Sequence, residues 1–519
     1  MPAVARLGYE ACMSNDPERA DGADPAPGIS RRRLLTSSAA SAVLGGVGVG
    51  GAALVWSHHS HPQGPAVWYQ PDRNGAPPVV GVHLQFGENA GTEVVVSWHT
   101  TDAVRNPRVM LGTPTSGFGR TVAAETRTYR DGKSNLEVRV NHARLTNLTP
   151  DTDYVYAAVH DGAEPETGTV RTAPVGRKPL RFTSFGDQST PTLGKLPNGS
   201  YGTDNIGSPA AADTTLAIER LGPLFNLVNG DLCYANLAQD RIRTWSDWFE
   251  NNTRSARYRP WMPAAGQTAV TRGLWYAFTA GAMRVISIAN DDVCYQDGGN
   301  SYVRGYSAGA QKAWLEQELA AARRAPHIDW VVVCMHQVAI STADMFNGAD
   351  LGIREEWVPL FDKYGVDLVV CGHEHHYERS HPIRGHESNP TLTPVPAATA
   401  TDVIDTTQGT VHMVIGGGGT SIPSNQLFFN PPACRVITAV GEQPDPKTGK
   451  RAPVYIKEHA PWSAVRNAAH AYGFAAFTLD PGSVRGGTTS IKVVYYDVVG
   501  PDGQLAAFES FTLRRPRRD

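Results

Sequence analysis

Carboxylate, phenol and imidazole side chains gather in four short motifs of this sequence. The motifs are FGDQS (185–189), NGDLCYAN (229–236), VCMH (333–336) and GHEH (372–375). Oxygen and imidazole ligands without thiolates suit iron, zinc or manganese. The candidate metal ligands in these motifs are Asp187, Asp231, Tyr234, His336, His373 and His375. A carboxylate such as Asp231 can bridge two cations, so the set is large enough for a pair of metal ions.

Each motif lies at or just past the end of a predicted strand. The strands are LRFTSF (180–185), LFNLVN (224–229), 330–335 and 367–371. Helical patterns over 212–222, 308–324 and 354–365 alternate with these strands, which predicts an α/β domain with helices covering the sheet. Ligands of such sheets bind beyond the carboxyl ends of the strands. The four motifs are therefore expected to meet at one place.

The preceding segment, residues 66–175, has the short alternating runs of an all-β sandwich. Within it, LTNLTPDTDYVYAAV (145–159) resembles the strand corner of fibronectin type III-like domains. In that corner a tyrosine hydroxyl reaches the backbone, a role that Tyr154 and Tyr156 fit. We expect this domain to be structural, and we place the catalytic domain at 180–513.

The first 65 residues are expected to be a leader and a linker. Three arginines, Arg31 to Arg33, precede a Gly/Ala-rich apolar run from Ser37 to Trp56, after a long polar start. This arrangement resembles a bacterial twin-arginine export signal. We therefore expect a secreted or cell-envelope protein. No A-x-A cleavage site follows, so an uncleaved membrane anchor is the alternative.

Composition narrows the class of protein. The chain has 519 residues, 41% of them hydrophobic and 19% charged, which is typical of a globular protein with more than one domain. The net charge of −3 gives no reason to expect nucleic acid as a partner. Six cysteines without C-x-x-C spacing imply no disulfide framework. The tail RRPRRD (514–519) is expected to be a solvated end.

Taken in order, the motifs resemble the metallophosphoesterases, and within them the purple acid phosphatases. That family carries D-x-G, G-D-x-x-Y, G-N-H-[DE], V-x-x-H and G-H-x-H, where this chain has GDQS, GDLCY, GQTA, VCMH and GHEH. The resemblance covers roughly residues 66–500. It implies a four-layer α/β/β/α sandwich, preceded by the fibronectin type III-like domain.

The resemblance also implies a ligand assignment. A ferric ion would be held by Asp187, Asp231, Tyr234 and His375. Asp231 would bridge to a second divalent ion (Fe, Zn or Mn) that is also held by His336 and His373. The implied activity is hydrolysis of phosphate monoesters by a hydroxide that the two metals activate, with visible colour from the bond between tyrosinate and iron.

The sequence departs from the family pattern at three places. Ser189 replaces a glycine of the first block, and the loop 337–352 lacks a histidine that relatives often carry there. In the third block, Gln267 stands in place of the asparagine ligand and Thr268 in place of the histidine. We keep Gln267 as a tentative metal ligand and expect reduced efficiency, since no side-chain acid for the leaving group is evident. Three other histidines are candidate substitutes for that acid: His376, His459 and His470.

Three other hypotheses remain open at this point. The first is a degenerate protein that binds metal or phosphate without efficient turnover, which GQTA favours. The second is a phosphodiesterase or phospholipase D-like enzyme of the same superfamily, because shortening near residue 267 could widen the cleft. An adhesion role of the β-sandwich alone leaves the histidines unexplained.

Overall fold

The computed structural model describes residues 76–191, 193–195, 201–203, 205–266, 274–296, 303–446 and 450–519. The expected leader 1–65, and with it the export prediction, lies outside this range, as do Gln267 and Thr268. Within the described residues, no helix combines the length and the hydropathy that a membrane crossing requires.

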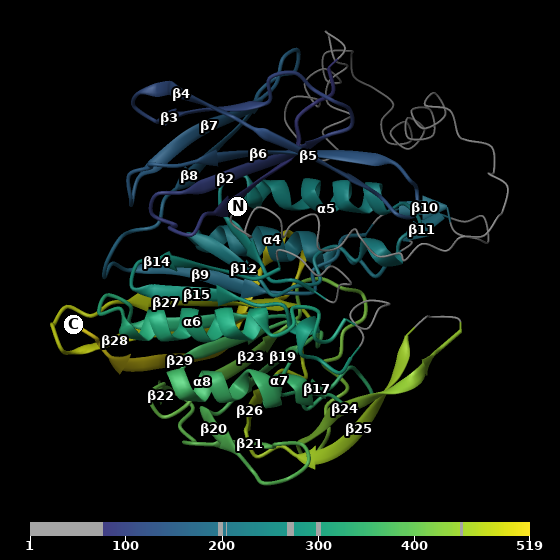
Figure 1. The fold of residues 1–519 in the computed structure, drawn as a ribbon, viewed down its shortest axis with the longest axis vertical. Helices are drawn as coiled ribbons and strands as arrows, with labels where there is room; N and C mark the ends of the chain where they lie inside the picture. Colours follow the sequence, from purple (N-terminus) through teal and green to yellow (C-terminus); the bar gives the residue numbers. More distant parts are fainter. Residues whose placement is uncertain are drawn as a thin grey trace.

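The N-terminal domain is an all-β sandwich of two four-stranded antiparallel sheets (Figure 1). One sheet has the strand order β1 (Val80–Phe86), β2 (Val94–Thr100), β6 (Glu137–Leu145) and β5 (Glu125–Arg130). The other has the order β4 (Gly117–Ala123), β3 (Arg108–Thr113), β7 (Asp153–Val159) and β8 (Glu166–Arg171).

The two tyrosines of the predicted corner have different roles. The Tyr154 hydroxyl accepts a hydrogen bond from the backbone N–H of Thr149 at 2.8 Å, as expected for a tyrosine corner. The Tyr156 hydroxyl instead donates to the carbonyl oxygen of Arg257 at 2.7 Å, in the next domain. Only Tyr154 is a local corner residue, and Tyr156 joins the domains.

Helix α5 (Arg241–Ala256) packs against the N-terminal domain through contacts with β1. In Figure 1 the helix lies just below the strands of that domain. Its first turn is capped by Asp240, which accepts a hydrogen bond from the Arg243 N–H. The Thr253 hydroxyl donates to the carbonyl of Val82 at 3.0 Å. The rings of His83 and Phe249 stack 4.7 Å apart. These contacts fix one domain on the other.

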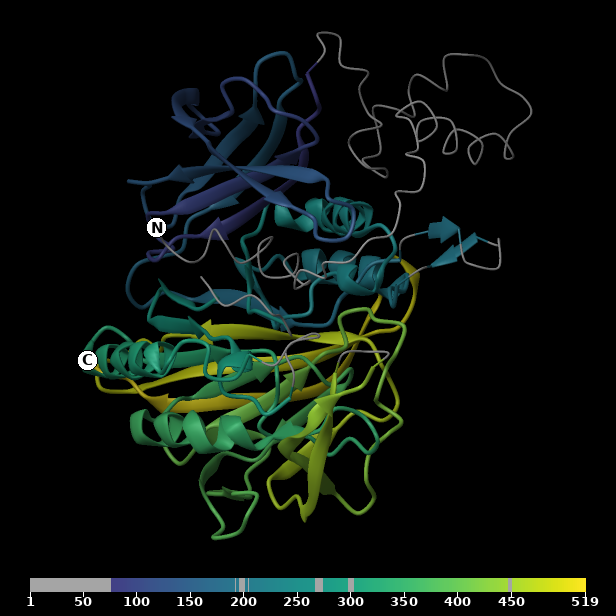
Figure 2. The same ribbon diagram turned by 45° about the vertical axis from the view of Figure 1, so that its right-hand side comes forward.

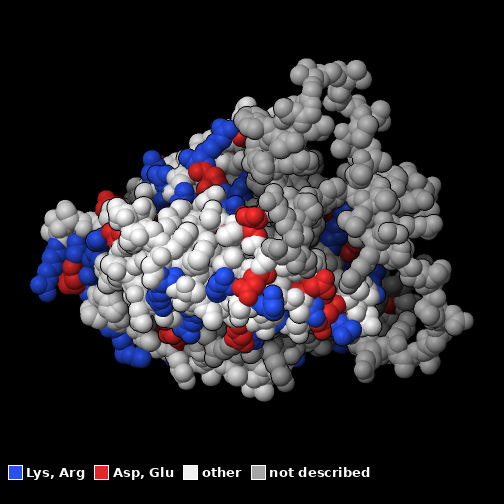
Figure 3. Space-filling model, turned by 90° about the horizontal axis from the view of Figure 1, so that it is seen from above, with Lys and Arg blue, Asp and Glu red and all other residues white. Residues whose placement is uncertain are grey.

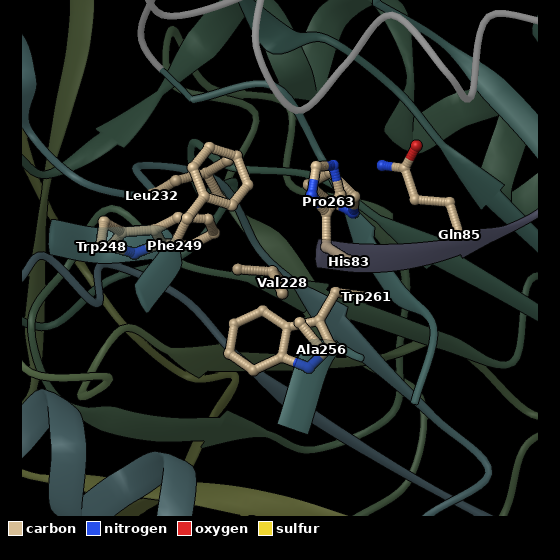
Figure 4. Close-up of a pocket in the computed structure, with 9 residues that line it drawn as sticks. All are labelled: His83, Gln85, Val228, Leu232, Trp248, Phe249, Ala256, Trp261 and Pro263. Atoms are coloured by element: carbon tan, nitrogen blue, oxygen red, sulfur yellow. The ribbon is translucent and has the colours of Figure 1, made fainter. Parts of the chain in front are cut away.

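A small, mostly apolar pocket lies at this domain interface (Figure 4). His83 and Gln85 line it from the N-terminal domain, and the catalytic domain contributes Val228, Leu232, Trp248, Phe249, Ala256, Trp261 and Pro263. None of the candidate metal ligands is among these residues. The pocket is therefore part of the domain packing, directly behind the segment that carries Asp231.

The second domain contains two seven-stranded sheets packed face to face (Figure 2). The first has the order β13 (Trp261–Pro263), β12 (Phe225–Val228), β9 (Leu180–Phe185), β27 (Gly473–Asp480), β28 (Thr488–Val498), β29 (Leu505–Pro516) and β22 (Val403–Asp405). The second has the order β14 (Tyr276–Ala280), β15 (Met283–Ser287), β16 (Trp330–Cys334), β18 (Leu368–Cys371), β23 (Val411–Ile415), β19 (Tyr377–Ser380) and β26 (Ser463–Arg466).

Helices cover the outer faces of both sheets. Helices α4 (Ala210–Leu221) and α5 lie on the first sheet, and α6 (Ala310–Arg324), α7 (Leu351–Glu356) and α8 (Val358–Tyr364) lie on the second (Figure 1). This is the predicted four-layer α/β/β/α sandwich. A hairpin of β24 (Ala433–Pro444) and β25 (Arg451–His459) pairs with β17 (Ala349–Asp350) beside these layers.

Strand β16 shows why the central strands are apolar throughout. Trp330, Val332 and Cys334 belong to the core between the two sheets, whereas Val331 and Val333 belong to the core beneath α6 and α8. Successive side chains point to opposite faces of a strand. Both faces are covered here, so no polar alternation is left in the sequence.

The C-terminal tail is part of the fold, so the expectation of a solvated end is wrong for Arg515, Arg517 and Arg518, which are only partly exposed. Strand β29 extends to Pro516, and the side chain of Arg515 is only 12% exposed where it meets Asp367. On the face seen in Figure 3, basic and acidic side chains lie close to one another.

Candidate metal centre

The six predicted ligands lie at the carboxyl ends of four strands. Asp187 follows β9, and Asp231 and Tyr234 follow β12, which is parallel to β9 in the first sheet. His336 follows β16, and His373 and His375 follow β18, its parallel neighbour in the second sheet. The centre therefore lies where the ends of both sheets meet.

Three of these side chains converge on one point. The Tyr234 hydroxyl is 2.9 Å from Oδ1 of Asp187 and 3.0 Å from Nε2 of His375. The same Nε2 is 3.3 Å from Oδ1 of Asp187. Phenol, carboxylate and imidazole atoms at these separations can act as ligands of one cation.

A second group meets beside the first. Nε2 of His336 is 3.3 Å from Oδ1 of Asp231 and 3.2 Å from Nδ1 of His373. One ligand atom each from Asp187, Asp231 and His336 all lie within 4.8 Å of one another. This separation joins the two groups into one centre, with Asp231 between them.

Backbone carbonyls determine which nitrogen of two histidines faces the centre. Nδ1 of His336 lies 2.9 Å from the carbonyl oxygen of Asn229, and Nδ1 of His375 lies 2.6 Å from that of Ile422. A carbonyl oxygen can only accept, so each Nδ1 carries a proton and Nε2 is the nitrogen available to a cation. Both Nε2 atoms lie 3.3 Å from a carboxylate oxygen of the centre. Histidines that bind metals are usually oriented in this way, so the residues fit a cation.

His373 is oriented by a residue that the sequence motifs did not indicate, Gln296. Its amide oxygen lies 3.0 Å from Nε2 of His373, which leaves Nδ1 to face the centre. The N–H groups of Tyr295 and Gln296 donate to the buried carboxylate of Asp350. Burial raises the pKa of Asp350 to about 6, although hydrogen bonds from these N–H groups oppose the shift. Gln296 belongs to no motif, so only its place in the fold identifies it.

We expect Gln296→Leu to weaken binding of the cation beside His373 by about 10- to 100-fold, the usual effect of losing such an orienting partner. Leucine is similar in size but accepts no hydrogen bond, so the His373 ring can turn or change tautomer. Metal content after dialysis against a graded chelator measures the effect. As a control, Gln426→Leu changes a solvent-exposed glutamine. Equal retention of both metals in Gln296→Leu would show that His373 is held by packing alone.

The pKa shifts at the centre also favour a cation. Burial raises the pKa of the Tyr234 phenol well above its usual value, and the carboxylates of Asp187 and Asp231 raise it further. Burial alone would lower the pKa of His336, but Asp231, together with Asp187 and the Asn229 backbone, raises it to about 10. Burial, helped by His336, lowers the pKa of His373 well below its usual value. A bound cation would displace the proton from His336 and reverse the shift at Tyr234.

Four of the six residues have a left-handed backbone, with φ of 56° at Asp187, 43° at Asp231, 54° at Tyr234 and 70° at His373. This region is uncommon for residues other than glycine. Such conformations cost about 1–3 kcal/mol each and concentrate at functional sites. Gly372 is also constrained, because a Cβ there would lie 2.3 Å from Oδ2 of Asp187.

The tentative ligand Gln267 lies outside the described residues and stays a prediction. Its described neighbour Gly266 reaches the centre, since a Cβ on Gly266 would lie 2.1 Å from Oδ1 of Asp231. The altered third block therefore begins directly beside the proposed bridging carboxylate.

The three histidines considered as substitute acids have other partners. His376 is fully buried, with Nδ1 2.8 Å from the Ser424 hydroxyl. Nε2 of His459 pairs with Glu387 at 2.8 Å. The ring of His470 faces Asp497 at 3.9 Å. None of these contacts is with one of the six ligands, and a role of any of the three as the acid stays a prediction.

Comparisons with known proteins agree with this geometry. Residues 79–173 match the family described as purple acid phosphatase, N-terminal domain, and residues 206–377 match the calcineurin-like phosphoesterases. The chain is 66% identical over 523 residues to an uncharacterized protein of Mycobacterium tuberculosis, covering 96% of this chain and 98% of that protein. It is 25% identical over 373 residues to the purple acid phosphatase of Glycine max, covering 65% and 72% of the two chains.

Two solved structures share the fold. The purple acid phosphatase isolated from yellow lupin seeds superimposes with a TM-score of 0.62 at 20% identity, covering 85% of this chain and 75% of that one. PhoD superimposes with a TM-score of 0.51 at 11% identity, covering 86% and 92%. At these identities the similarity concerns architecture.

Proposed function

The chain belongs to the purple acid phosphatase-like calcineurin-like phosphoesterases, and on that premise we propose that it hydrolyses phosphate monoesters at the metal centre. The observation that carries the proposal is the convergence of ligand atoms from four strand ends, with Asp231 between the two groups. A separation of Asp231 from His336 too long for both to bind one cation would contradict this proposal.

We assign a ferric ion to Asp187, Asp231, Tyr234 and His375, and a divalent ion (Fe, Zn or Mn) to Asp231, His336 and His373. A bound metal pair supplies Lewis acidity, which lowers the pKa of water and offsets charge on phosphate oxygens. The chain's own part is to hold the ligands. Backbone carbonyls orient the imidazoles of His336 and His375, and Tyr234 supplies a phenol that would lose its proton on binding a cation.

A leaving-group acid is missing from this proposal, because the three candidate histidines are engaged elsewhere. General acid catalysis typically contributes about 10²- to 10⁴-fold. We therefore propose that turnover depends strongly on the leaving group, with aryl phosphates cleaved well and alkyl phosphates slowly. The altered GQTA block also supports a second candidate, a protein that binds metal or phosphate with little turnover.

One experiment separates these candidates. Purified, iron-loaded protein is expected to hold two metal ions per chain, to absorb visible light and to hydrolyse 4-nitrophenyl phosphate. Tyr234→Phe is expected to lose the absorbance while keeping part of the activity, since phenylalanine removes only the phenol oxygen. One ion per chain with negligible hydrolysis would favour the binding protein. A faster rate on a bis-aryl phosphate than on 4-nitrophenyl phosphate would favour a phosphodiesterase. Absorbance retained in Tyr234→Phe would mean that this tyrosine is not a ligand.

Export through the twin-arginine route is part of the same proposal and rests on the sequence of the first 65 residues alone. That route carries folded proteins, which suits a protein that loads metal before it leaves the cytoplasm. The substrates would then be phosphate esters outside the cytoplasm.

A further inference from the structure

We infer that the centre is built for phosphate esters whose organic group is apolar, and that two loops beside His375 contact that group. This inference rests on the proposed function and names its substrate class. The loops span residues 341–348 and 420–429. We call five of their apolar residues the apolar rim: Met345, Phe346, Ile422, Pro423 and Leu427.

The two loops form one unit. The Phe429 N–H donates to the carbonyl of Thr342 at 2.9 Å, and Ala343 and Phe428 form an antiparallel bridge. The Asp344 N–H also donates to the carbonyl of Leu427. Because these hydrogen bonds join the two loops, the loops hold a defined position relative to each other.

His375 lies between these loops and the metal centre. The ring of Phe346 meets the His375 ring edge-on, with 5.0 Å between centroids. The carbonyl oxygen of Ile422 holds Nδ1 of the same ring, and the Ser424 N–H donates to the His375 carbonyl. The other side of His375 faces Tyr234 and Asp187. Phe346 and the backbone of Ile422 therefore place the two loops directly beside a ligand of the centre.

Three of the rim residues are exposed, although burying their apolar side chains would stabilise the fold. Met345 is 80% exposed, Ile422 47% and Leu427 37%. Met345 also has φ of 59°, a backbone conformation that disfavours a bulky side chain. An exposed methionine with a left-handed backbone contributes little to the fold. Its position at the edge of the centre instead suits contact with an apolar part of a substrate, as binding sites combine apolar walls with a few polar groups.

Para-alkylphenyl phosphates test the inference, because alkyl groups at that position lengthen the apolar group while hardly changing the leaving oxygen. The metal-loaded full chain is expected to show kcat/KM increasing on the order of tenfold from phenyl to 4-butylphenyl phosphate, mainly through KM. Partial burial of the butyl group by the rim accounts for a gain of this size. No increase along the series, with phenyl phosphate hydrolysed normally, would overturn the inference and leave the proposed function intact.

Two variants connect the effect to the rim. Met345→Asn keeps a residue that tolerates the left-handed backbone, and Ile422→Ser keeps the carbonyl that holds His375. Each is expected to reduce the 4-butylphenyl to phenyl ratio of kcat/KM about threefold. Val484→Ser, a similarly exposed apolar position at 67%, should leave the ratio unchanged. An undiminished ratio in both rim variants would overturn the inference.

Binding of compounds that cannot be hydrolysed gives a readout that does not need turnover. Titration calorimetry is expected to show tighter binding of 4-butylphenylphosphonate than of phenylphosphonate, and Met345→Asn should narrow the difference. If this preference is found while no ester is hydrolysed, the rim is supported and the proposed phosphatase activity fails. Equal affinity for both phosphonates would overturn the inference that the apolar rim contacts the organic group of the substrate.

Discussion

Asp231→Ala is expected to release both metal ions and to reduce kcat/KM on aryl phosphates by about 10³-fold or more. Its carboxylate lies 3.3 Å from Nε2 of His336 and joins the two groups of ligand atoms, so no other side chain replaces it. Losing one orienting partner costs about 10- to 100-fold in metal affinity, and losing a shared ligand should cost more. Metal analysis and initial rates on the same preparation measure both effects.

The removal of Asp231 has a second consequence that needs no substrate. Burial lowers the pKa of His336, whereas Asp231, together with Asp187 and the Asn229 backbone, raises it to about 10, so removing Asp231 should lower the pKa of His336. Titration of the metal-free protein by NMR would detect this change. Asp161→Asn is the control, because it alters a surface carboxylate paired with Arg108. Two ions retained in Asp231→Ala would refute the bridging assignment.

Asp367→Asn is expected to have the largest effect on stability, about 3–5 kcal/mol in the free energy of unfolding. The carboxylate is fully buried and accepts hydrogen bonds from Arg323 at 2.7 Å and from Arg515 at 2.6 and 2.7 Å. The Thr406 hydroxyl and the Val331 N–H donate to it as well. An amide of equal size removes the negative charge and leaves two largely buried guanidinium groups without it.

The dependence of this effect on pH follows from the direction of the pKa shift. Burial would raise the pKa of Asp367, but Arg323 and Arg515 outweigh burial and lower it. The stabilisation is therefore complete above the unfolded pKa of about 4 and is lost as pH falls through the lower, folded pKa. Urea unfolding at pH 7 and in acid should show the difference between wild type and variant shrinking in acid. A constant difference would mean that shape, rather than charge, matters at this position.

Asp161→Asn again serves as the control for stability, since exposed ion pairs contribute little. The comparison also tests the role of the C-terminus. Arg515 comes from β29, almost at the end of the chain, and Arg323 from the end of α6. If Asp367→Asn were no more destabilising than Asp161→Asn, the C-terminal strand would not depend on this contact.

Much of the centre could be predicted from the sequence because its signals are local. An apolar run that ends in GD or in histidine marks a strand end, and parallel strands place such ends together. The Tyr154 corner is local as well, with its partner Thr149 five residues away. The strand predicted over 330–335 is present as β16, and the cores on both of its faces explain why its sequence is apolar.

Contacts between distant segments were beyond the sequence. Gln296 lies 77 residues from His373, and no spacing rule connects them. His376 follows the GHEH motif directly, yet its ring turns to Ser424 rather than to the centre. From the sequence, the arginines of the tail are expected to be solvated. In the structure Arg515 donates a hydrogen bond to Asp367, which is far from it in the sequence.

The amino-acid sequence by itself therefore determined the types of ligand, their order and the strand ends that carry them, because these depend on short-range patterns of burial. The tertiary structure alone decided which nitrogen of each imidazole faces the centre and which apolar side chains surround it. These properties depend on carbonyl and amide groups that fold into place from other elements. Which nitrogen of a histidine carries the proton depends on the group that it contacts, and the sequence does not show which distant group that is.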